Sequence, residues 1–556
     1  MASDILLATI NAKWIHPSLA LRLLKANLGP LEERCAIMEF ALRQPLAEKV
    51  APILAANPRI LGLSVSVWNH AATVELLKAL RKEQGTGELG LGTGDCTGRD
   101  WGEITGEDLT QRRRGAEDAK KRGKKERSLK AVFIYNTTSS RTKIPAPCSL
   151  FPIPRSPFII LGGPEVSHLP PDAEIFQYAD FVVRGEGEHL FRKLCEQILN
   201  GDTPKGDFTP EPVDLNSIKT GYYLYSDEDL CKKMTYVESS RGCPFSCEFC
   251  MAAASSLHTK VRHFPLDTFL AEMDGLVERG ARTFKFLDRA FNADIERACK
   301  IMEFFLEKID IQLALGQRPL VVHFEMLPSR FPQKLRETLM CFPPGTLRLE
   351  IGIQTFNEEV AARIGRPSAP EKELEALQFL REKTNAIIHA DLIAGLPGEG
   401  MVSFGNGFDR LWDALFPPQY KNANNQQAAQ PSSPHAEKQT ESPRVEIQLG
   451  ILKLLPGASI ARHTDTFGMR YNPQPPYEVL ETAALPACEL DRIKNFARFW
   501  ELIVNRALVN WQPTGPSAFL QFMALSDSLL ERFGRNWGID KNELRQAVEE
   551  REVISG

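Results

Sequence analysis

The stretch TYVESSRGCPFSCEFC, residues Thr235–Cys250, decides the fold of the second half of the chain. It opens with a strand pattern at Thr235–Glu238, and the cysteines Cys243, Cys247 and Cys250 follow at the spacing C-x3-C-x2-C. A cysteine-rich loop directly after a strand predicts a site at the carboxyl end of that strand, where barrel proteins build their active sites.

Two kinds of site are compatible with these three cysteines. Thiolates select soft metals, chiefly zinc and iron–sulfur clusters. A structural zinc ion needs a fourth ligand, which His258 or His263 could supply. The position after a barrel strand favours the cluster. In addition, three cysteines leave one iron of a cubane open for a substrate or cofactor.

The chain downstream of the cysteines alternates between strand and helix patterns. Strands are predicted at Thr235–Glu238, Thr283–Leu287, Leu320–Phe324, Leu347–Ile353, Ala386–Ile393 and Val445–Leu454. Helices are predicted between them, at 265–279, 294–309, 330–341, 371–383 and 404–415. Six such units predict a partial (βα)6 barrel over residues 234–456 rather than a full barrel. A low-complexity insertion at about 417–444 interrupts the last unit.

The chain upstream, residues 1–200, alternates in the same way. Strands are predicted at Asp4–Ile10, Cys35–Phe40, Arg59–Val65, Phe158–Leu161 and Asp180–Val183. Helices are predicted at Pro17–Leu28, Pro45–Ala56, Asn69–Arg81, Pro171–Tyr178 and Glu188–Leu199. This pattern predicts a doubly wound α/β domain of the flavodoxin-like type, with its ligand crevice at the carboxyl ends of the strands.

Three further segments depart from this alternation. The segment at about 85–157 is predicted to be a disordered insertion. Its basic run, Arg112–Arg127, could be a nucleic-acid or targeting patch, although a solvated loop is the simpler interpretation. A linker rich in Pro, Gly and Asp is expected at 201–233. Residues 478–556 are predicted to be helical, with Ile493, Phe496, Trp500 and Ile503 on one packed face.

The composition excludes several classes of protein. The 556 residues are 43% hydrophobic and 25% charged, which excludes a wholly disordered chain and a collagen-like fibre. A net charge of -4 makes no general case for attraction to nucleic acids or membranes. No apolar run is long enough to span a bilayer, and the N-terminus lacks the pattern of a signal peptide. Sparse cysteines fit a reducing compartment, so a cytoplasmic protein is expected.

The cysteine loop and three later segments resemble the radical S-adenosylmethionine (SAM) superfamily. Beyond the cysteines, the matching residues are Phe249, Phe286–Asn292 (FLDRAFN), Leu349–Thr355 (LEIGIQT) and Asp391–Glu399 (DLIAGLPGE). The resemblance covers about residues 235–454. It implies that Cys243, Cys247 and Cys250 hold a 4Fe-4S cluster whose open iron binds SAM. In that family, electron transfer then cleaves SAM and yields a 5′-deoxyadenosyl radical.

The same resemblance implies which residues contact SAM. The segment around Asp288 takes the methionine amino group, a carboxylate on the fourth strand contacts the cofactor, and the fifth-strand segment packs on adenine. The implied SAM-binding residues are Phe249, Asp288, Arg289, Glu350, Gln354, Asp391, Ile393 and Gly395. Taken singly, Asp288 or Glu350 could be an ordinary salt-bridge partner.

Two glycine-containing segments of the first 200 residues resemble the cobalamin-binding domain of cobalamin-dependent radical enzymes. They are Ile159–Ser167 (IILGGPEVS) and Asp180–Glu188 (DFVVRGEGE). Glycines let the backbone approach a flat macrocycle or its nucleotide tail, although a tight strand-to-helix turn would also explain Gly162 and Gly163. The implied cobalamin-binding residues are Ser64, Ser66, Gly162, Gly163, Glu165, Gly185, Glu186 and Gly187.

The cobalt-ligand motif of many cobalamin domains, D-x-H-x-x-G, is incomplete in this chain. The matching window, Trp14–Leu19, keeps only His16. A metal-binding histidine normally needs a hydrogen-bond acceptor to fix its tautomer. His16 is therefore a poor candidate ligand, and cobalt without a protein nitrogen below it is at least as compatible with the sequence.

The whole chain resembles a cobalamin-binding-domain-containing radical SAM protein with a helical C-terminal extension. The expected activity is cobalamin-dependent methyl transfer to an unactivated carbon of a substrate, a small molecule or otherwise, that the sequence does not identify, with radical cyclisation or rearrangement as the alternative. A methylthiotransferase is disfavoured, since that class needs three more cysteines in its first domain. A zinc- or cluster-stabilised RNA-binding protein is the rival from another class. The expected partner is an electron donor such as flavodoxin or ferredoxin; nucleic acid is not an expected partner.

Overall fold

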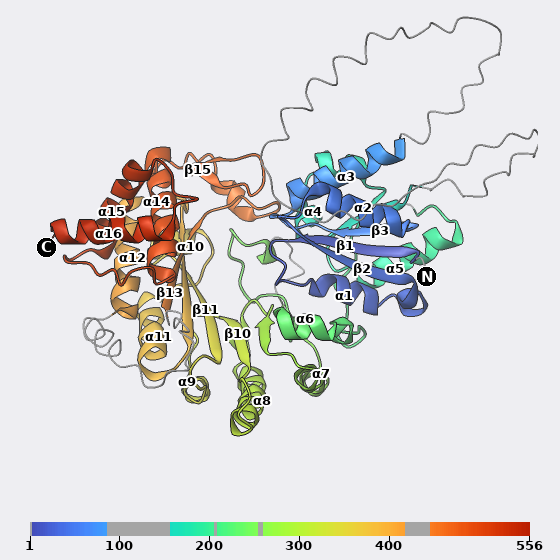
Figure 1. Ribbon diagram of the computed structural model, residues 1–556, viewed down its shortest axis with the longest axis horizontal. Coiled ribbons are helices and arrows are strands. Elements are labelled where there is room, and N and C mark those ends of the chain that lie inside the picture. The colour runs from blue at the N-terminus through green and yellow to red at the C-terminus, as the bar shows by residue number, and fades with distance from the viewer. Residues whose placement is uncertain (1–2, 86–155, 205–207, 254–259, 417–444, 556) are drawn as a thin grey trace, which may run out of the picture. The chain divides into compact units, whose positions relative to one another are not determined.

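A computed structural model describes residues 3–85, 156–204, 208–253, 260–416 and 445–555 (Figure 1). Residues Met1–Arg81 and Ser156–Gly556 form one compact unit, which contains two parallel sheets. The insertions expected at about 85–157 and 417–444 lie almost entirely outside the described residues. Within the described part of the chain, no helix has the length and apolarity needed to cross a membrane.

The first sheet has five parallel strands in the order β2-β1-β3-β4-β5. These strands are β1 (Ile5–Asn11), β2 (Cys35–Ala41), β3 (Ile60–Ser64), β4 (Phe158–Gly162) and β5 (Phe181–Val182). The helices on its two faces are α1 (Leu19–Ala26), α2 (Leu46–Ala56), α3 (His70–Gly85), α4 (Pro164–His168) and α5 (Glu188–Asn200). This order confirms the flavodoxin-like α/β class. In that class the direction in which successive strands are added to the sheet reverses beside β1.

Strand β1 shows why this sheet needs a continuous apolar sequence. Leu6, Ala8 and Ile10 pack into the core on one face of the sheet, whereas Ile5 and Leu7 pack into the core on the other. Because side chains alternate along a strand, a sheet covered on both faces buries every residue of its central strands. The helix predicted at Pro171–Tyr178 is reduced to a short 3-10 helix, Glu174–Tyr178.

The second sheet has six parallel strands in the order β13-β12-β11-β10-β9-β6. They are β6 (Thr235–Val237), β9 (Thr283–Phe286), β10 (Val321–Met326), β11 (Leu347–Gln354), β12 (Ile387–Ala394) and β13 (Val445–Ile451). The accompanying helices are α7 (Leu266–Glu278), α8 (Ile295–Ala314), α9 (Gln333–Met340), α10 (Glu358–Arg363), α11 (Pro370–Lys383) and α12 (Met401–Leu415). Figure 1 shows α7, α8 and α9 following one another along the outer side of this sheet.

The two faces of the second sheet differ in polarity. Along β11, Leu347, Leu349, Ile351 and Ile353 are buried, while the alternate residues Arg348, Glu350, Gly352 and Gln354 are only partly buried. The apolar face packs on the helices, so the polar face turns to the inside of the partial barrel. Of the candidate SAM-binding residues, Glu350, Gln354, Asp391 and Ile393 are among these alternate, partly buried positions of β11 and β12.

The segment expected to be a linker, 201–233, is largely folded where it is described. It contains a 3-10 helix at Tyr222–Leu224 and α6 (Asp227–Lys232). Tyr222 and Tyr225 are 3% and 1% exposed and join the barrel core. Its frequent Pro, Gly and Asp residues predicted a linker. The two buried tyrosine side chains, which pack this segment against the barrel core, were not predicted.

The C-terminal region is helical as predicted, except at its start. Its helices are α14 (Ala487–Trp500), α15 (Ala518–Phe533) and α16 (Lys541–Ser555), with a π-helix at Glu501–Asn505. Before them, β14 (Arg470–Tyr471) pairs antiparallel with β15 (Val479–Glu481), which corrects the prediction of helix from residue 478. In Figure 1 these helices lie beside α12 and β13, and their apolar residues belong to the same core cluster as the barrel.

We expect Trp500→Ala to destabilise the barrel together with the C-terminal region. Trp500 is 1% exposed, and its ring centroid lies 4.9 Å from that of Phe408 on α12 and 4.8 Å from that of Phe522 on α15. Removing a buried Trp side chain should lower the free energy of unfolding by about 3–5 kcal/mol. Denaturant titration measures this change. Trp537→Ala is the control because Trp537 is 67% exposed, and equal losses in the two variants would contradict the shared core.

Candidate functional site

The cysteine loop begins at the carboxyl end of β6. It leaves the two-residue strand β7 (Ser240–Arg241), which pairs antiparallel with β8 (Arg262–His263). Gly242, between β7 and the first cysteine, has a φ of 99°, a left-handed conformation that favours glycine. This turn directs Cys243, Cys247 and Cys250 away from the strand, and all three side chains are partly exposed.

The three cysteines follow one another in one loop and interact electrostatically with each other and with two arginines, although no group of three side chains among the described residues is arranged to hold a metal ion. Burial raises the pKa of Cys243 and of Cys247, and Cys250 raises both values further. The guanidinium of Arg366 acts in the opposite direction on both thiols, and that of Arg289 does so on Cys243. Cations beside these thiols favour the thiolate form, which is the form that an iron–sulfur cluster takes as a ligand.

Glu248, inside the cysteine loop, anchors it to distant parts of the chain. Its backbone N–H donates to the carbonyl of Ile364 at 2.9 Å, and its own carbonyl accepts from the N–H of Ile460 at 3.0 Å. Its carboxylate lies 3.0 Å from both Nε of Arg462 and Nε2 of His463. The loop is therefore held from both sides before any cluster binds.

Asp288 connects the ends of β9 and β6. Its carboxylate is hydrogen-bonded to other residues of the protein. Its carboxylate accepts from the backbone N–H of Ser239 at 2.9 Å, from Oγ of Ser239 at 2.7 Å and from Oγ of Ser240 at 2.5 Å. Burial raises its pKa, against these hydrogen bonds. Asp288 thus positions the root of the cysteine loop, and neighbouring Arg289 lines a cavity described below.

Glu350 on β11 lies within a polar row on the inner face of the barrel. Its carboxylate accepts from Nζ of Lys285 on β9 at 2.9 and 3.1 Å. Although burial acts in the opposite direction, His323 and Lys285 lower its pKa. A carboxylate held by two such bonds is an ionised anchor of the inner wall.

Two histidines extend this polar row across β10 and β12. The rings of His323 and His389 are stacked with centroids 5.8 Å apart, and Nδ1 of His389 lies 3.1 Å from the Glu446 carboxylate on β13. Neither ring nitrogen of His323 has a hydrogen-bond partner, and burial lowers its pKa to about 3. Lys285, His323, Glu350, His389 and Glu446 thus form a polar belt with unused hydrogen-bonding groups.

Asp391 and Glu325 are the protonatable acids above this belt. Burial raises the pKa of each to about 7, and the charge of Glu350 adds to the effect on both. Oδ1 of Asp391 is buried without a partner, and Glu325 lines the cavity near Arg289. Both acids can hold or release a proton near neutral pH.

The remaining candidate SAM-binding residues lie at the ends of β11 and β12 or in the cysteine loop. Gln354 has a φ of 71° beside a register shift in the ladder. Gly395 has a φ of 87°, and a Cβ there would lie 2.5 Å from Val479. Ile393, on β12, is partly buried, as is Phe249, which packs against the barrel core.

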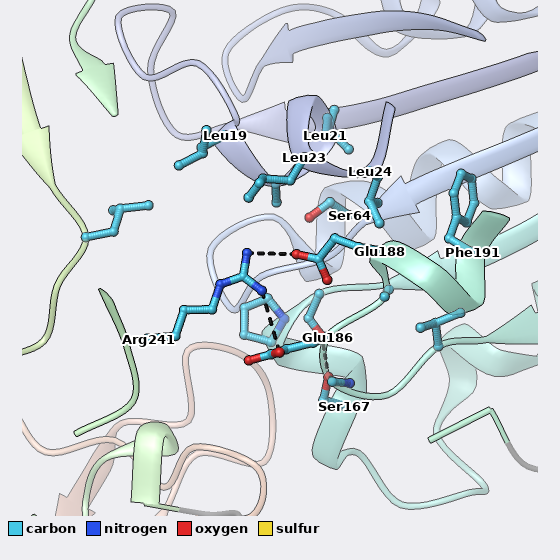
Figure 2. A pocket seen from close by; sticks show the side chains of 18 of the residues that line it. Leu19, Leu21, Leu23, Leu24, Ser64, Ser167, Glu186, Glu188, Phe191 and Arg241 are labelled. Atoms are coloured by element: carbon cyan, nitrogen blue, oxygen red, sulfur yellow. Dashed lines mark hydrogen bonds and ion pairs between the residues drawn. The ribbon is translucent and has the colours of Figure 1, made fainter. Parts of the chain in front are cut away.

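A cavity of about 500 Å³ lies at the carboxyl ends of the first sheet (Figure 2). Leu19, Leu21, Leu23 and Leu24 of α1 and Phe191 of α5 form an apolar side of its wall. Barrel residues close it opposite them, including Glu238, Ser240, Arg241, Gly242, Met251, Leu287, Arg289 and Glu325. The cavity therefore reaches from the first sheet to the root of the cysteine loop.

The two adjacent glycines of the first-sheet motif have different roles. A Cβ on Gly163, whose φ is 104°, would lie 2.6 Å from the carbonyl oxygen of Val65, so the fold itself requires glycine there. A Cβ on Gly162 would meet only the carbonyl of Val183, at 3.8 Å. Gly162 therefore borders open space in the cavity, and the same is true of Gly185, whose Cβ would meet nothing within 4 Å.

The other residues assigned to cobalamin divide between the cavity and its surroundings. Ser64, Glu186 and Gly187 line the cavity, whereas Ser66 and Glu165 are absent from its lining. Glu165 is fully buried and bonds instead to Nδ1 of His70 at 2.8 Å and the hydroxyl of Tyr477 at 2.6 Å. Its position fits a structural contact between the first sheet and the C-terminal region.

His16 is also absent from the cavity lining. Its Nδ1 lies 2.9 Å from the hydroxyl of Tyr236 on β6. Burial lowers its pKa, and Lys13 and Lys285 add to the effect. The imidazole thus contacts the barrel strand.

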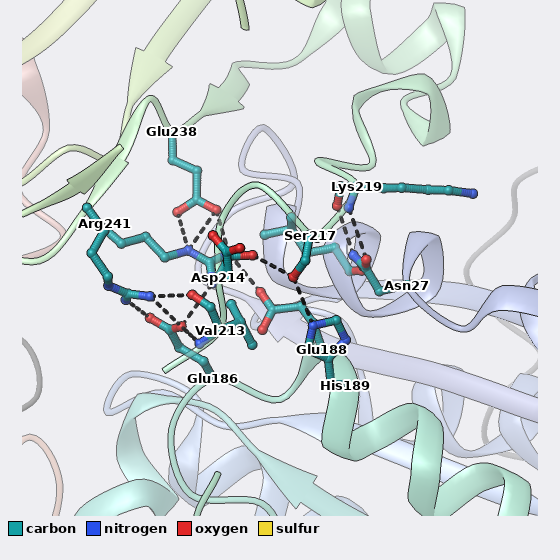
Figure 3. Close-up of polar contacts among 12 residues, drawn as sticks. Asn27, Glu186, Glu188, His189, Val213, Asp214, Ser217, Lys219, Glu238 and Arg241 are labelled. Carbon is teal, nitrogen blue, oxygen red and sulfur yellow. Dashed lines mark hydrogen bonds and ion pairs between the residues drawn. The ribbon is translucent and has the colours of Figure 1, made fainter. Parts of the chain in front are cut away.

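Charged groups from both halves of the chain meet at one end of the cavity (Figure 3). The guanidinium of Arg241 lies 2.7 Å from the carboxylates of Glu188 and Glu238 and 3.6 Å from that of Glu186. Arg262 forms a second ion pair with Glu186. Although burial opposes it, Arg262 and Arg241 lower the pKa of Glu186.

Sequence patterns missed Arg241, Glu325 and Arg366 as candidate site residues. Arg366 donates to the carbonyls of Gly352 and Ile353 and acts on Cys247. Arg241 stands two residues before Cys243, and Glu325 follows the third barrel strand pattern; position was the only available signal for either. Their partners come from elements far away in sequence.

Comparison with known proteins identifies the second half of the chain. Residues 237–408 match the family model of the Radical SAM superfamily. The chain is 26% identical over 267 residues to the uncharacterized methyltransferase PH0819 of Pyrococcus horikoshii, covering 44% of this chain and 55% of that protein. It is 25% identical over 192 residues to the ribosomal protein uS12 methylthiotransferase RimO of Sulfurovum sp., covering 32% and 41%.

A further relative and one solved structure complete the comparison. The chain is 24% identical over 288 residues to the 2-(S-pantetheinyl)-carbapenam-3-carboxylate methyltransferase of Streptantibioticus cattleyicolor, covering 46% of this chain and 40% of that protein. The cobalamin-dependent SAM radical enzyme OxsB superposes with a TM-score of 0.57 and 14% identity, covering 99% of this chain and 75% of that one. OxsB therefore shares the fold.

The chain carries a radical SAM domain at residues 237–408, which implies a 4Fe-4S cluster and SAM as its cofactors. The aligned regions span from 41% to 55% of the length of the first two relatives.

We expect Asp391→Asn to reduce the loss of stability that the wild type shows as pH rises. The folded protein keeps the Asp391 proton up to a pKa of about 7, whereas the unfolded chain releases it near pH 4. Stability from this proton is complete below about pH 4 and is lost as pH rises through about 7. Relative to Asp391→Asn, the wild type should lose about 2 kcal/mol of unfolding free energy between about pH 5 and 7.5.

Urea titration at the two pH values measures this difference. Asp310→Asn is the control, because Asp310 is exposed on α8. Parallel pH profiles for the wild type and Asp391→Asn would contradict the raised pKa.

Proposed function

We propose that this chain, with its radical SAM domain, is an enzyme that uses cobalamin as a second cofactor and transfers a methyl group to an unactivated carbon. The observation that carries the proposal is the cavity of about 500 Å³. It extends from Gly162 and Gly185 of the first sheet to Arg241, Gly242 and Arg289 beside the cysteine loop. Two cofactors bound on opposite sides of one cavity can act on the same substrate.

Cys243, Cys247 and Cys250 are the proposed ligands of a 4Fe-4S cluster, with SAM on the open iron. When bound, the cluster supplies the electron that cleaves SAM, and cobalamin supplies the methyl group. Glu248 fixes the loop between two of the cysteines through Ile364 and Ile460. Such anchoring keeps the ligands in place before the cluster arrives, which is how a protein preorganises a metal site.

We propose that Arg289, Gln354, Asp391, Ile393 and Gly395 border bound SAM, with Phe249 beside the cluster. Asp288 is assigned a supporting role, because its carboxylate already accepts three hydrogen bonds from Ser239 and Ser240. Glu350 is assigned a supporting role for the same reason, because both of its carboxylate oxygens accept hydrogen bonds from Lys285. Each keeps its neighbours in place for the cofactor.

Residues around the first sheet and one structural neighbour support cobalamin as the second cofactor. Leucines of α1 offer an apolar wall for the nucleotide base, and Gly162 leaves room for the macrocycle. OxsB, which shares this fold, is described as cobalamin-dependent. His16 bonds to Tyr236 away from the cavity lining, which supports cobalt without a protein nitrogen below it.

The polar belt inside the barrel supports a polar small-molecule substrate. His323 offers Nδ1, while its Nε2 lies 3.5 Å from the Glu350 carboxylate, and His389 offers Nε2. A buried unpartnered group costs stability unless a ligand satisfies it. An external low-potential donor such as flavodoxin or ferredoxin is the proposed source of the electron.

Methylthiotransferases are among the relatives, but the first sheet does not favour that reaction. Within the described part of residues 1–200, the cysteines are Cys35 and Cys195. Both are buried in the apolar core beside α5, and burial raises the pKa of Cys35 to about 12 and that of Cys195 further. Protonated core thiols are poor ligands for a second cluster.

Anaerobic reduction with SAM, cobalamin and candidate substrates, followed by mass spectrometry, tests the reaction. A gain of one methyl group supports the proposal. A product of unchanged mass or one that has lost only hydrogen would support rearrangement or cyclisation instead.

We expect Cys247→Ala to lose most of its iron and its cluster absorbance after anaerobic reconstitution, because two thiolates hold a cubane poorly. Cys341→Ala is the matched control, since Cys341 is exposed at the end of α9. Iron analysis and visible absorbance provide the measurement. Full iron content in Cys247→Ala, or stoichiometric zinc in the wild type, would overturn the cluster assignment.

We expect Gly162→Leu to weaken cobalamin binding by about 10–100-fold, because the new side chain would fill the cavity. His16→Ala should leave the affinity unchanged. Gly275→Leu, on α7, is the control, because a Cβ there meets nothing within 4 Å and lies outside the cavity. Absorbance titration with hydroxocobalamin measures binding, and a loss of affinity confined to His16→Ala would contradict the assignment of the lower face.

A further inference from the structure

The charged end of the cavity contains more carboxylates than cations. Glu186, Glu188 and Glu238 face the guanidinium groups of Arg241 and Arg262, and burial raises the pKa of Glu238. Arg289 and Glu325 line the same cavity. The three carboxylate side chains are between 6% and 11% exposed. In a buried site of this kind, charges are weakly screened, so an additional anion is strongly disfavoured.

Glu188 also has an unused acceptor. Its Oε1 accepts from Nη2 of Arg241 at 2.7 Å, whereas its Oε2 is buried without any hydrogen-bond partner. Glu188 lines the cavity, and Figure 2 shows its carboxylate between Arg241 and the leucines of α1. An unpaired buried carboxylate oxygen is costly, so this position demands an N–H or O–H donor from a ligand.

The rest of the wall restricts the ligand further. Leu21, Leu24 and Phe191 border the cavity close to Glu188 with apolar side chains that accept no hydrogen bonds. A suitable ligand therefore combines an apolar surface with N–H donors at its edge. Free carboxylates at that edge would face Glu186 and Glu188 and leave Oε2 of Glu188 unsatisfied.

We propose that Glu188, with Glu186 beside it, accepts hydrogen bonds from a carboxamide side chain of a corrinoid, so that the cavity selects amidated corrinoids over those with free carboxylates. This inference rests on the proposed cobalamin function. It adds a specificity for the rim of the macrocycle and assigns it to one buried acceptor.

The test compares hydroxocobalamin with its b-, d- and e-monocarboxylic acids, in each of which one carboxamide is hydrolysed to a carboxylate. All four keep the nucleotide and the rest of the macrocycle, so they differ only at the rim. Absorbance titration of the full-length protein gives their dissociation constants. At least one monocarboxylic acid should bind about tenfold or more weakly than hydroxocobalamin, because it loses a hydrogen bond to a charged group and gains a repulsion.

The variant Glu188→Gln assigns the effect to the residue. The glutamine side chain is uncharged and can donate, so the discrimination against the same monocarboxylic acid should fall to about threefold or less. Glu196→Gln is the matched control on the same helix, because Glu196 is 41% exposed and pairs with Arg192. It should discriminate as the wild type does.

The outcomes separate this inference from the function on which it rests. Equal affinity of the wild type for all four corrinoids would overturn the inference and leave cobalamin binding intact. Discrimination that persists unchanged in Glu188→Gln would overturn the assignment to Glu188. Binding of none of the four would overturn the cobalamin function itself. The comparison with wild-type protein needs no variant, so it remains decisive if Glu188→Gln does not fold.

Discussion

The arrangement of the site depends on the ion pairs that the guanidinium of Arg241 forms. The guanidinium binds Glu188 at the start of α5 and Glu238 at the end of β6, and so joins the first sheet to the root of the cysteine loop. Removing one partner of a buried ion pair costs about 3–5 kcal/mol, because the other charge remains unpaired. This contact lies at the end of the cavity, where the first sheet meets the root of the cysteine loop.

Most of the fold could be predicted because parallel sheets leave a strong trace in sequence. Strand β1 is buried from Ile5 to Ile10 and mostly apolar since both of its faces are covered, and the alternating pattern of β11 shows one covered and one polar face. The helices of the segment 201–233 were not predicted, because this segment has no clear hydrophobic pattern. Its two buried tyrosines stand among Pro, Gly and Asp, and tertiary packing rather than local propensity orders them.

The site was less predictable, since its properties depend on partners that sequence spacing does not reveal. Gly162 and Gly163 look alike in sequence, yet one borders open space and the other is required by the carbonyl of Val65. Glu165 was expected to contact cobalamin. In the structure its carboxylate instead accepts a hydrogen bond from the hydroxyl of Tyr477 in the C-terminal region. The cysteines could be identified because ligand spacing within one loop is a local property.

Buried polar atoms without hydrogen-bond partners occur where ligands are proposed to bind, and they also occur in packed regions of the described residues, for example at Glu165, Trp412 and Trp500. Glu188 in the cavity and His323, His389 and Asp391 in the barrel all present buried atoms without hydrogen-bond partners. Each such atom lowers stability, and the aromatic core around Trp500 provides compensating burial elsewhere. A ligand that forms hydrogen bonds with these atoms would gain this interaction energy. The polarity of the barrel interior is therefore better explained as preparation for a bound molecule than as part of the packing that holds the chain folded.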